Sequence, residues 1–269
     1  MPDYFKEKNS PNVKAYIRTY GCQMNDRDSE NIAAQFIERG WEITDDENQA
    51  DVAVVNTCSV REQAEQKAIG KLGHLIWLRK PFGKDFPVVG VTGCMAQNKG
   101  EDLVKLLPDI DFVAGARQTY KVADIAIDIY NKRKNGITHP PIPKGGKRTP
   151  KTSAAFVDIS DDTKSHLYIN KHLPALGAKR ACAFISIMQG CQMNCSYCIV
   201  PKVRGAQRSR PTQDIVDEAK RLADEGVREI TLLGQVVNAF GRELGKTDGI
   251  TEFVRLLRAI NDIDGIERI

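Results

Sequence analysis

A cluster of three cysteines constrains this 269-residue chain more strongly than any other feature of its sequence. Cys191, Cys195 and Cys198 are spaced C-x-x-x-C-x-x-C, and they follow an apolar run at residues 183–188 that predicts a buried strand. A closed structural zinc site takes four ligands, and a ferredoxin-type cluster takes four cysteines. Three neighbouring thiolates could instead hold three irons of a cubane and leave the fourth iron open. A zinc knuckle is the alternative interpretation.

An aromatic residue, Tyr197, stands directly before the third cysteine and makes the spacing more specific. The stretch at residues 190–201 resembles the cluster loop of the radical S-adenosylmethionine enzymes. That resemblance implies a 4Fe–4S cluster whose open iron binds the amino and carboxylate groups of S-adenosylmethionine. It also implies that Cys191, Cys195 and Cys198 are catalytic cysteines and that Tyr197 belongs to the cofactor site.

The composition indicates the compartment in which such a centre would be found. The chain has seven cysteines, no apolar N-terminal signal and no apolar run long enough to span a bilayer. These features predict a cytoplasmic protein without membrane association. Thiols stay reduced in the cytosol, so clustered cysteines are expected to bind metal rather than to form disulfides.

Residues 131–153 are predicted to form a linker between two domains. They carry seven Lys or Arg and no acid, so the rest of a chain with net charge +4 sums to −3. The segment is rich in proline and glycine and has no apolar period. Its charge fits either a contact with a nucleic acid backbone or a solvated tether. The predicted domains are residues 1–130 and 154–269.

The first domain shows strands that alternate with helices. Strands are predicted at residues 13–20, 51–56, 88–92 and 111–114. Helices are predicted at residues 26–39, after Ser59, between Cys94 and about residue 107, and at residues 120–133. Ser59 and Glu62 have the form of a capping box for the second helix. This order predicts an α/β fold with an open parallel sheet and right-handed crossovers.

A cysteine stands two residues beyond the end of each of the first three predicted strands. These are Cys22, Cys58 and Cys94, and 36 residues separate each from the next. Because the carboxyl ends of parallel strands share one edge of a sheet, the three thiols are expected to converge there. The alternative is three unrelated small core residues, since free cysteine is often buried. Their identical placement favours a second three-cysteine cluster with one open iron.

The sequences around these cysteines resemble the opening motifs of the methylthiotransferases. The similar segments are TYGCQMN at residues 19–25, NTCSVRE at residues 56–62 and GCMAQ at residues 93–97. They are similar to the branch that adds a methylthio group to carbon 2 of isopentenylated adenosine in the tRNA anticodon loop. Branches that act on threonylcarbamoyladenosine tRNA or on a ribosomal protein are the alternatives.

The resemblance to methylthiotransferases implies a division of labour between two 4Fe–4S clusters. The cluster of the second domain would cleave S-adenosylmethionine reductively, and the cluster of the first domain would insert the sulfur. The implied partners are tRNA, an electron donor of the flavodoxin or ferredoxin type, and a sulfur donor. The protein is expected to act as a monomer.

The second domain is predicted to be the first part of a radical S-adenosylmethionine partial (β/α)6 barrel. Its strands are predicted at residues 183–188 and 229–233, its helices at residues 213–225 and 251–261, and a third strand from residue 267. Family members that resemble this chain have a six-unit barrel and a C-terminal RNA-binding β-domain. The chain is therefore expected to be truncated.

The resemblance also implies cofactor contacts after the second strand of this domain. Gly234, Gln235 and Asn238 would lie beside the amino group of S-adenosylmethionine, where backbone and amide acceptors suit an ammonium donor. Val236 stands where family sequences usually have Asn. For Gln235, the alternative is a turn residue that caps the strand.

A basic run without acids follows the cluster loop, and it is predicted to contact RNA phosphates. The predicted RNA contacts are Arg204, Arg208 and Arg210. The family usually has Glu where this chain has Gln207. A solvated polar face is the alternative for Arg208 and Arg210.

Two functions of other classes remain as alternatives to an enzyme. An iron–sulfur electron carrier would need four cysteines for each cluster, and no further cysteine of this chain is suitably placed. A zinc-dependent RNA-binding module would contain zinc without sulfide.

Overall fold

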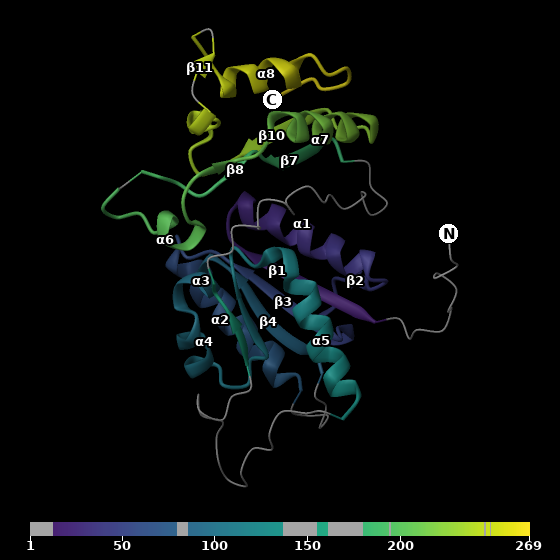
Figure 1. Ribbon diagram of the computed structural model, residues 1–269. Helices are drawn as coiled ribbons and strands as arrows, with labels where there is room; N and C mark the ends of the chain where they lie inside the picture. The colour runs from purple at the N-terminus through teal and green to yellow at the C-terminus, as the bar shows by residue number, and fades with distance from the viewer. Residues whose placement is uncertain are drawn as a thin grey trace.

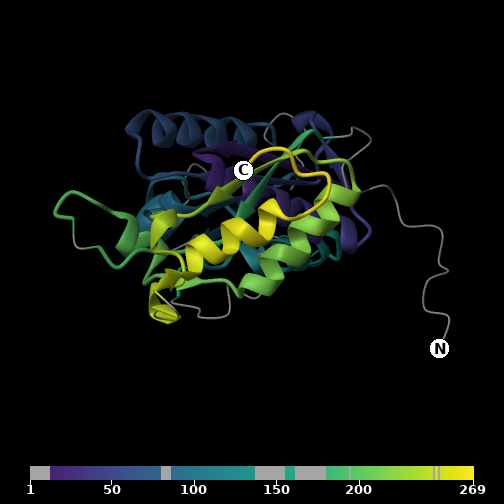
Figure 2. The ribbon, with the colours of Figure 1, turned by 90° about the horizontal axis from the view of Figure 1, so that it is seen from above.

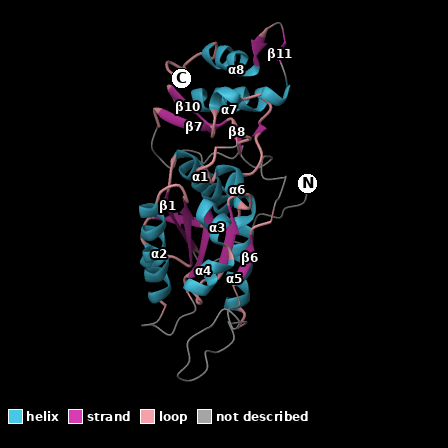
Figure 3. Ribbon diagram, turned by 90° about the vertical axis from the view of Figure 1, so that its left-hand side faces the viewer, coloured by secondary structure: helices cyan, strands magenta, loops and turns pink. Residues whose placement is uncertain are grey.

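The computed structural model describes residues 13–79, 86–136, 155–160, 180–193, 195–244, 246–247 and 249–269. It consists of an α/β domain built on a six-stranded sheet and of a smaller α/β unit packed against one end of that sheet (Figure 1). Figure 3 shows the smaller unit stacked above the end of the sheet at which helix α1 lies. The predicted α/β class is confirmed.

All strand pairs of the large sheet are parallel, in the order β2-β1-β3-β4-β5-β6. The strands are β1 (Lys14–Tyr20), β2 (Glu42–Thr44), β3 (Val52–Thr57), β4 (Val88–Gly93), β5 (Phe112–Gly115) and β6 (Phe156–Asp158). Every residue of the central strands β3 and β4 is buried. Their near-continuous apolar sequences fit strands that are covered on both faces.

Helices cover both faces of this sheet. They are α1 (Gln23–Glu38), α2 (Glu62–Trp77), α3 (Cys94–Lys99), α4 (Glu101–Leu106) and α5 (Val122–Lys134). Because side chains alternate along a strand, Val55 joins one core with Leu72 of α2, while Val54 joins another with Phe36 of α1 and Ala126 of α5. The predicted alternation of strands and helices is confirmed, and β2 and β6 are additional strands.

Two details of the predicted helices are wrong. The helix expected from Cys94 to about residue 107 is broken into α3 and α4 at Gly100, which has φ +43°. The capping box does not form, because α2 is capped at Arg61 and the Ser59 hydroxyl donates instead to Glu65 at 2.5 Å. The local sequence pattern thus located both helices but not their ends.

The predicted boundary at residue 154 also needs correction. Strand β6 (Phe156–Asp158) pairs in parallel with β5, and the Phe156 amide donates to the Asp111 carbonyl at 2.9 Å. These main-chain hydrogen bonds place residues 156–158 in the first sheet, not in the second domain. Helix α5 also continues to Lys134, inside the predicted linker, and residues 137–154 lie outside the described residues.

The smaller unit contains two parallel strands covered by two helices. Its elements are β7 (Cys182–Ser186), β8 (Met188–Gln189), α6 (Val200–Arg204), β9 (Arg208–Ser209), α7 (Thr212–Asp224), β10 (Glu229–Leu233), η5 (Val237–Ala239), η6 (Arg242–Leu244), β11 (Lys246–Thr247), β12 (Ile250–Thr251) and α8 (Glu252–Asn261). Strand β7 pairs with β10, and Arg268 bridges Glu229 where a third strand was predicted. Figure 2 shows α7 and α8 side by side over these strands.

Helix α1 lies on the side of the first domain that faces the second (Figure 1), and its buried Arg27 and Asp28 pair with residues of the second domain. Arg27 has no exposed surface and forms an ion pair with Glu218 of α7 at 3.3 Å. Glu218 also pairs with the buried Arg210 at 2.6 Å. One carboxylate therefore lies between two guanidinium groups and joins the first domain to the second.

We expect Glu218→Ala to destabilise the protein by about 3–5 kcal/mol, because it removes the carboxylate that two buried guanidinium groups share. Urea unfolding measures this effect. The matched control is Asp128→Ala, which removes an exposed helical ion pair with Lys132 and should cost less than about 1 kcal/mol. Equal losses for the two variants would show that the buried contact does not join the domains.

Candidate functional site

The parallel register brings the first three cysteines to one edge of the large sheet. Tyr20 of β1 lies opposite Thr57 of β3, and Thr57 lies opposite Gly93 of β4. Cys58 directly follows Thr57, and Cys94 directly follows Gly93. Cys22 is separated from Tyr20 by one residue. The thiols of Cys58 and Cys94 are buried, whereas Cys22 is exposed. The three loops therefore form one site that opens toward Cys22.

Two buried asparagines fasten the first two cysteine loops together. Asn25 Oδ1 accepts a hydrogen bond from the Cys22 amide at 3.2 Å, and Asn25 Nδ2 donates to Asn56 Oδ1 at 3.1 Å. Asn25 Nδ2 also donates to the Thr57 carbonyl at 3.2 Å, and Asn56 Nδ2 donates back to the Asn25 carbonyl at 2.8 Å. No sequence motif indicated this pair, although both residues lie within three residues of a cysteine.

Gly93 allows the third cysteine loop to approach the other two. Its φ of +93° is unfavourable for residues with a side chain. A Cβ atom there would lie 2.4 Å from both Asn56 Oδ1 and the Thr57 carbonyl oxygen. Only glycine fits at this last position of β4, directly before Cys94.

The contacts of the first triad separate the acidities of its thiols. Cys58 donates a hydrogen bond to the Cys22 sulfur, which lowers the pKa of Cys22 to about 5 against the opposing effect of burial. The same hydrogen bond, together with burial, raises the pKa of Cys58. The Cys58 sulfur accepts from the Val60 amide at 3.3 Å. These contacts favour the ionised form of Cys22 over that of Cys58.

The second triad lies in the loop between β8 and α6. The Cys191 amide donates to the Gly205 carbonyl at 3.0 Å, and the Cys191 sulfur accepts from the Met193 amide at 3.4 Å. The Val60 amide makes the same kind of contact with the Cys58 sulfur, also from two residues further along the chain. The Cys198 amide donates to the Cys195 carbonyl at 3.1 Å. Cys191 is buried, Cys198 is half-buried and Cys195 is exposed.

The helix that follows the second triad packs on the first triad across the domain boundary. Helix α6, which follows Cys198 closely, packs on α3, which begins at Cys94. Val203 and Ile199 contact Cys94 and Ala116 in one small apolar cluster. Figure 1 shows α6 beside α3 at the top of the large sheet. The predicted convergence within the first domain thus extends to the loop of the second.

Two of the cysteine sulfurs accept hydrogen bonds from the main chain. In the described parts of the chain, no group of three or more His, Cys, Asp or Glu could hold a single metal ion. The main-chain amides that donate to the Cys58 and Cys191 sulfurs suit thiolate ligands.

Gln235 offers an acceptor that suits an ammonium group. Its Oε1 is buried and has no hydrogen-bond partner among the described residues. Gly234 precedes it at the end of β10, where a Cβ atom would lie 2.5 Å from Met188 Cγ. Val236 packs against the apolar core of the smaller unit. Asn238 lies exposed in η5, and Tyr197 is 90% exposed.

The structure buries two of the three arginines that were predicted to contact RNA. Arg204 and Arg210 are 5% and 2% exposed, and each forms an ion pair with a carboxylate. Neither guanidinium group is at the surface to meet a phosphate. Arg208 is partly exposed in β9. Gln207 donates to the Ala239 carbonyl at 2.7 Å and so ties this segment to η5.

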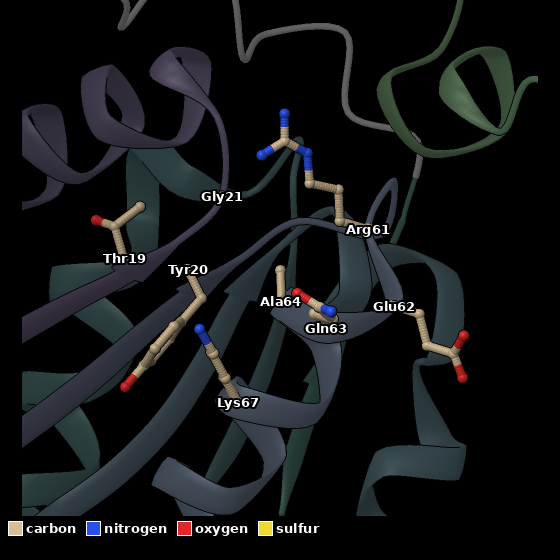
Figure 4. Close-up of a pocket in the computed structure, with 8 residues that line it drawn as sticks. All are labelled: Thr19, Tyr20, Gly21, Arg61, Glu62, Gln63, Ala64 and Lys67. Atoms are coloured by element: carbon tan, nitrogen blue, oxygen red, sulfur yellow. The ribbon is translucent and has the colours of Figure 1, made fainter.

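A pocket lies beside the first triad, between the end of β1 and the start of α2 (Figure 4). Its volume is about 490 Å³, and Gly21, the residue before Cys22, lines it. The other lining residues are Thr19, Tyr20, Arg61, Glu62, Gln63, Ala64 and Lys67. The Arg61 and Lys67 side chains bring positive charge to the open side of the cysteine edge.

Comparison with known families agrees with this arrangement. Residues 14–115 match the family described as "Uncharacterized protein family UPF0004", and residues 185–269 match the radical SAM superfamily. The chain is therefore similar to UPF0004 in its first part and to the radical SAM superfamily in its last part. None of the described helices is long and apolar enough to cross a membrane.

The chain is also similar to proteins named tRNA-2-methylthio-N(6)-dimethylallyladenosine synthase. It is 45% identical over 262 residues to the one from Akkermansia muciniphila, covering 95% of this chain and 54% of the relative. It is also 45% identical over 268 residues to the one from Opitutus terrae, covering 95% and 55%. The chain thus spans about half the length of the curated relatives it matches, and the predicted resemblance to the methylthiotransferases is confirmed.

A solved structure shares the fold at low sequence identity. It is the radical S-adenosylmethionine methyltransferase TsrM from Kitasatospora setae with cobalamin and a [4Fe-4S] cluster bound. The TM-score is 0.53 and the identity 14%, and the match covers 85% of this chain and 50% of that chain. This similarity supports the fold assignment.

We expect Gly93→Ala to prevent assembly of the first cluster, because the new Cβ would collide with Asn56 and Thr57. Anaerobic reconstitution should then yield about four irons per chain instead of about eight. The control is Gly40→Ala at the far end of α1, where φ is +79° but no atom lies within 4 Å of the added Cβ. That variant should lose about 1–3 kcal/mol of stability from strain but no iron. Full iron in Gly93→Ala would contradict the proposed packing of the three loops.

Proposed function

We propose that the protein containing this chain is a methylthiotransferase that modifies carbon 2 of isopentenylated adenosine in the tRNA anticodon loop. The observation that carries the proposal is the packing of α6, which follows one cysteine triad, on α3 and Cys94 of the other across the domain boundary. The names of the relatives at 45% identity supply the substrate class. An electron carrier would need no such pair of open sites.

The two triads would perform separate tasks. Cys191, Cys195 and Cys198 would hold a 4Fe–4S cluster in the radical SAM domain. When bound, this cluster and S-adenosylmethionine supply reductive cleavage to methionine and a 5′-deoxyadenosyl radical, which can take hydrogen from an aromatic carbon. Gln235 would accept a hydrogen bond from the ammonium group of the cofactor and orient it.

The residues of the first domain would hold the sulfur-bearing cluster. Cys22, Cys58 and Cys94 are the ligands, and the buried Cys58 and Cys94 shield its inner side from water. The exposed Cys22 marks the side from which a sulfur donor could approach. The neighbouring Arg61 and Lys67, with the partly exposed Arg208, carry charges suited to tRNA phosphates.

Exposed apolar residues on the cysteine loops fit an unpaired base. Val60, Met193 and Tyr197 are 64%, 48% and 90% exposed, and each lies within two residues of a cysteine. RNA-modifying proteins commonly stack splayed bases on such side chains. We infer that the adenine enters here, with tRNA, an electron donor and a sulfur donor as partners of a monomeric cytoplasmic enzyme.

The seventh cysteine argues against four-cysteine clusters. Cys182 begins β7, at the end of that strand opposite the cluster loop. It therefore cannot complete the triad of Cys191, Cys195 and Cys198. Threonylcarbamoyladenosine tRNA and a ribosomal protein remain alternative substrates, and mass spectrometry of tRNA nucleosides from cells lacking the complete protein distinguishes among them.

We expect Cys198→Ala and Cys58→Ala to separate the two activities in the complete protein. Cys198→Ala should abolish dithionite-driven formation of 5′-deoxyadenosine, because it removes a ligand of the cofactor-binding cluster. Cys58→Ala should retain that reaction but yield no methylthiolated adenosine. Each variant should keep about four of about eight irons.

The assay measures 5′-deoxyadenosine, the modified nucleoside and iron for each variant. Cys182→Ala is the control, because it removes a cysteine that belongs to neither triad, and it should retain both reactions. Methylthiolation by Cys58→Ala would refute the first domain as the sulfur site. Zinc without acid-labile sulfide in the purified protein would refute the enzyme assignment.

A further inference from the structure

Arg204 reaches from the radical SAM domain into the cysteine site of the other domain. It ends α6 and is 5% exposed. Its Nε donates to the Cys94 sulfur at 3.4 Å, and its Nη2 donates to Asp28 Oδ2 of α1 at 2.7 Å. One planar guanidinium group therefore contacts both a thiol of the first triad and a carboxylate on the helix that Cys22 caps.

The main chain beside Arg204 supports the second triad. Gly205 follows it with φ +78°, and the Gly205 carbonyl accepts the hydrogen bond from the Cys191 amide at 3.0 Å. Two adjacent residues thus connect the two centres, Gly205 through its main chain and Arg204 through its side chain. A displacement of this segment would alter both cysteine loops together.

The hydrogen bonding of Arg204 is incomplete without a further acceptor. Its Nη1 is buried and has no hydrogen-bond partner among the described residues. An unmatched buried donor is costly, and a guanidinium group buried only to pair with Asp28 would leave that cost uncompensated. Nη1 belongs to the same planar guanidinium group as Nε, which contacts the Cys94 sulfur. Inorganic sulfide of a cluster bound at Cys94 is an acceptor of the required charge.

We propose that Arg204 is a positioning residue that sets the reduction potential of the N-terminal cluster from the neighbouring domain. It donates to the Cys94 sulfur and brings a positive charge to the cluster. Hydrogen bonds to cluster sulfurs and nearby positive charge favour the reduced, more negative state. Docking of the radical SAM domain therefore raises the potential of the sulfur-bearing centre. This proposal rests on the proposed function only in requiring a cluster at Cys22, Cys58 and Cys94.

The test uses the complete protein with its second triad replaced by alanine, so that one cluster gives the signal. Arg204→Gln is compared with Arg204→Lys and with the matched control Arg210→Gln. Arg210 is an equally buried arginine of the same domain, but its carboxylate partner is Glu218 and it contacts no cysteine in the described contacts. The midpoint potential is measured by redox titration with electron paramagnetic resonance, beside iron content and thermal stability.

We expect Arg204→Gln to make reduction of the N-terminal cluster at least tenfold less favourable. This corresponds to a midpoint potential about 59 mV lower for a one-electron couple. The midpoint potential of Arg204→Lys should lie between those of Arg204→Gln and the parent protein, because a single charged amine replaces the planar guanidinium group and its several donors. Asp28→Asn should shift the potential upward, since it removes a negative charge from the guanidinium group. Arg210→Gln should lose stability without a shift in potential.

Each outcome decides the proposal. If Arg204→Gln takes up no iron while Arg210→Gln takes up the full amount, Arg204→Lys decides: a lowered potential supports the proposal and an unchanged potential overturns it. Equal iron loss in both variants, or an unchanged potential in Arg204→Gln, overturns it and leaves Arg204 as a domain contact. A parent protein without any N-terminal cluster overturns the proposed function as well.

Discussion

The common level at which β1, β3 and β4 end is the constraint on which the first cysteine site depends. Parallel pairing sets Tyr20, Thr57 and Gly93 in line, so the loops that carry the cysteines leave the sheet side by side. A slip of one residue would turn every side chain of a strand to the other face. The buried pair of Asn25 and Asn56 and the positive φ of Gly93 then hold these loops in contact.

Buried charges on α1 determine how the second domain meets this edge. Arg27 and Asp28 are consecutive, and each pairs with a buried residue of the other domain, Glu218 and Arg204. The free energy lost on removing these charges from water is about as large as the attraction gained within each ion pair. The pairs therefore select one docking arrangement of the domains and add little net stability. We infer that this selection holds the two cysteine triads together, as a reaction that needs both requires.

Exposure within the site follows the same division. Cys94, which contacts Arg204 of the second domain, is buried, as is Cys191, whereas Cys22 and Cys195 are exposed. The exposed apolar residues of the cysteine loops lie on the open side with them. A large substrate could therefore reach the outer edge of both centres, while the inner edge is filled by protein.

The sequence by itself determined the α/β class, most strands of the first sheet and the two sets of three cysteines, because these depend on local periodicity and spacing. Only the tertiary structure decided that β6 completes the first sheet and that Arg204 and Arg210 are buried. Nothing in a run of basic residues distinguishes a guanidinium group that meets solvent from one that meets Asp28 or Glu218. Those partners lie 176 residues away from Arg204 and on the next helix from Arg210. The contact of Arg204 arises from the docking of the domains and that of Arg210 from the packing of the following helix, and no local sequence pattern records either.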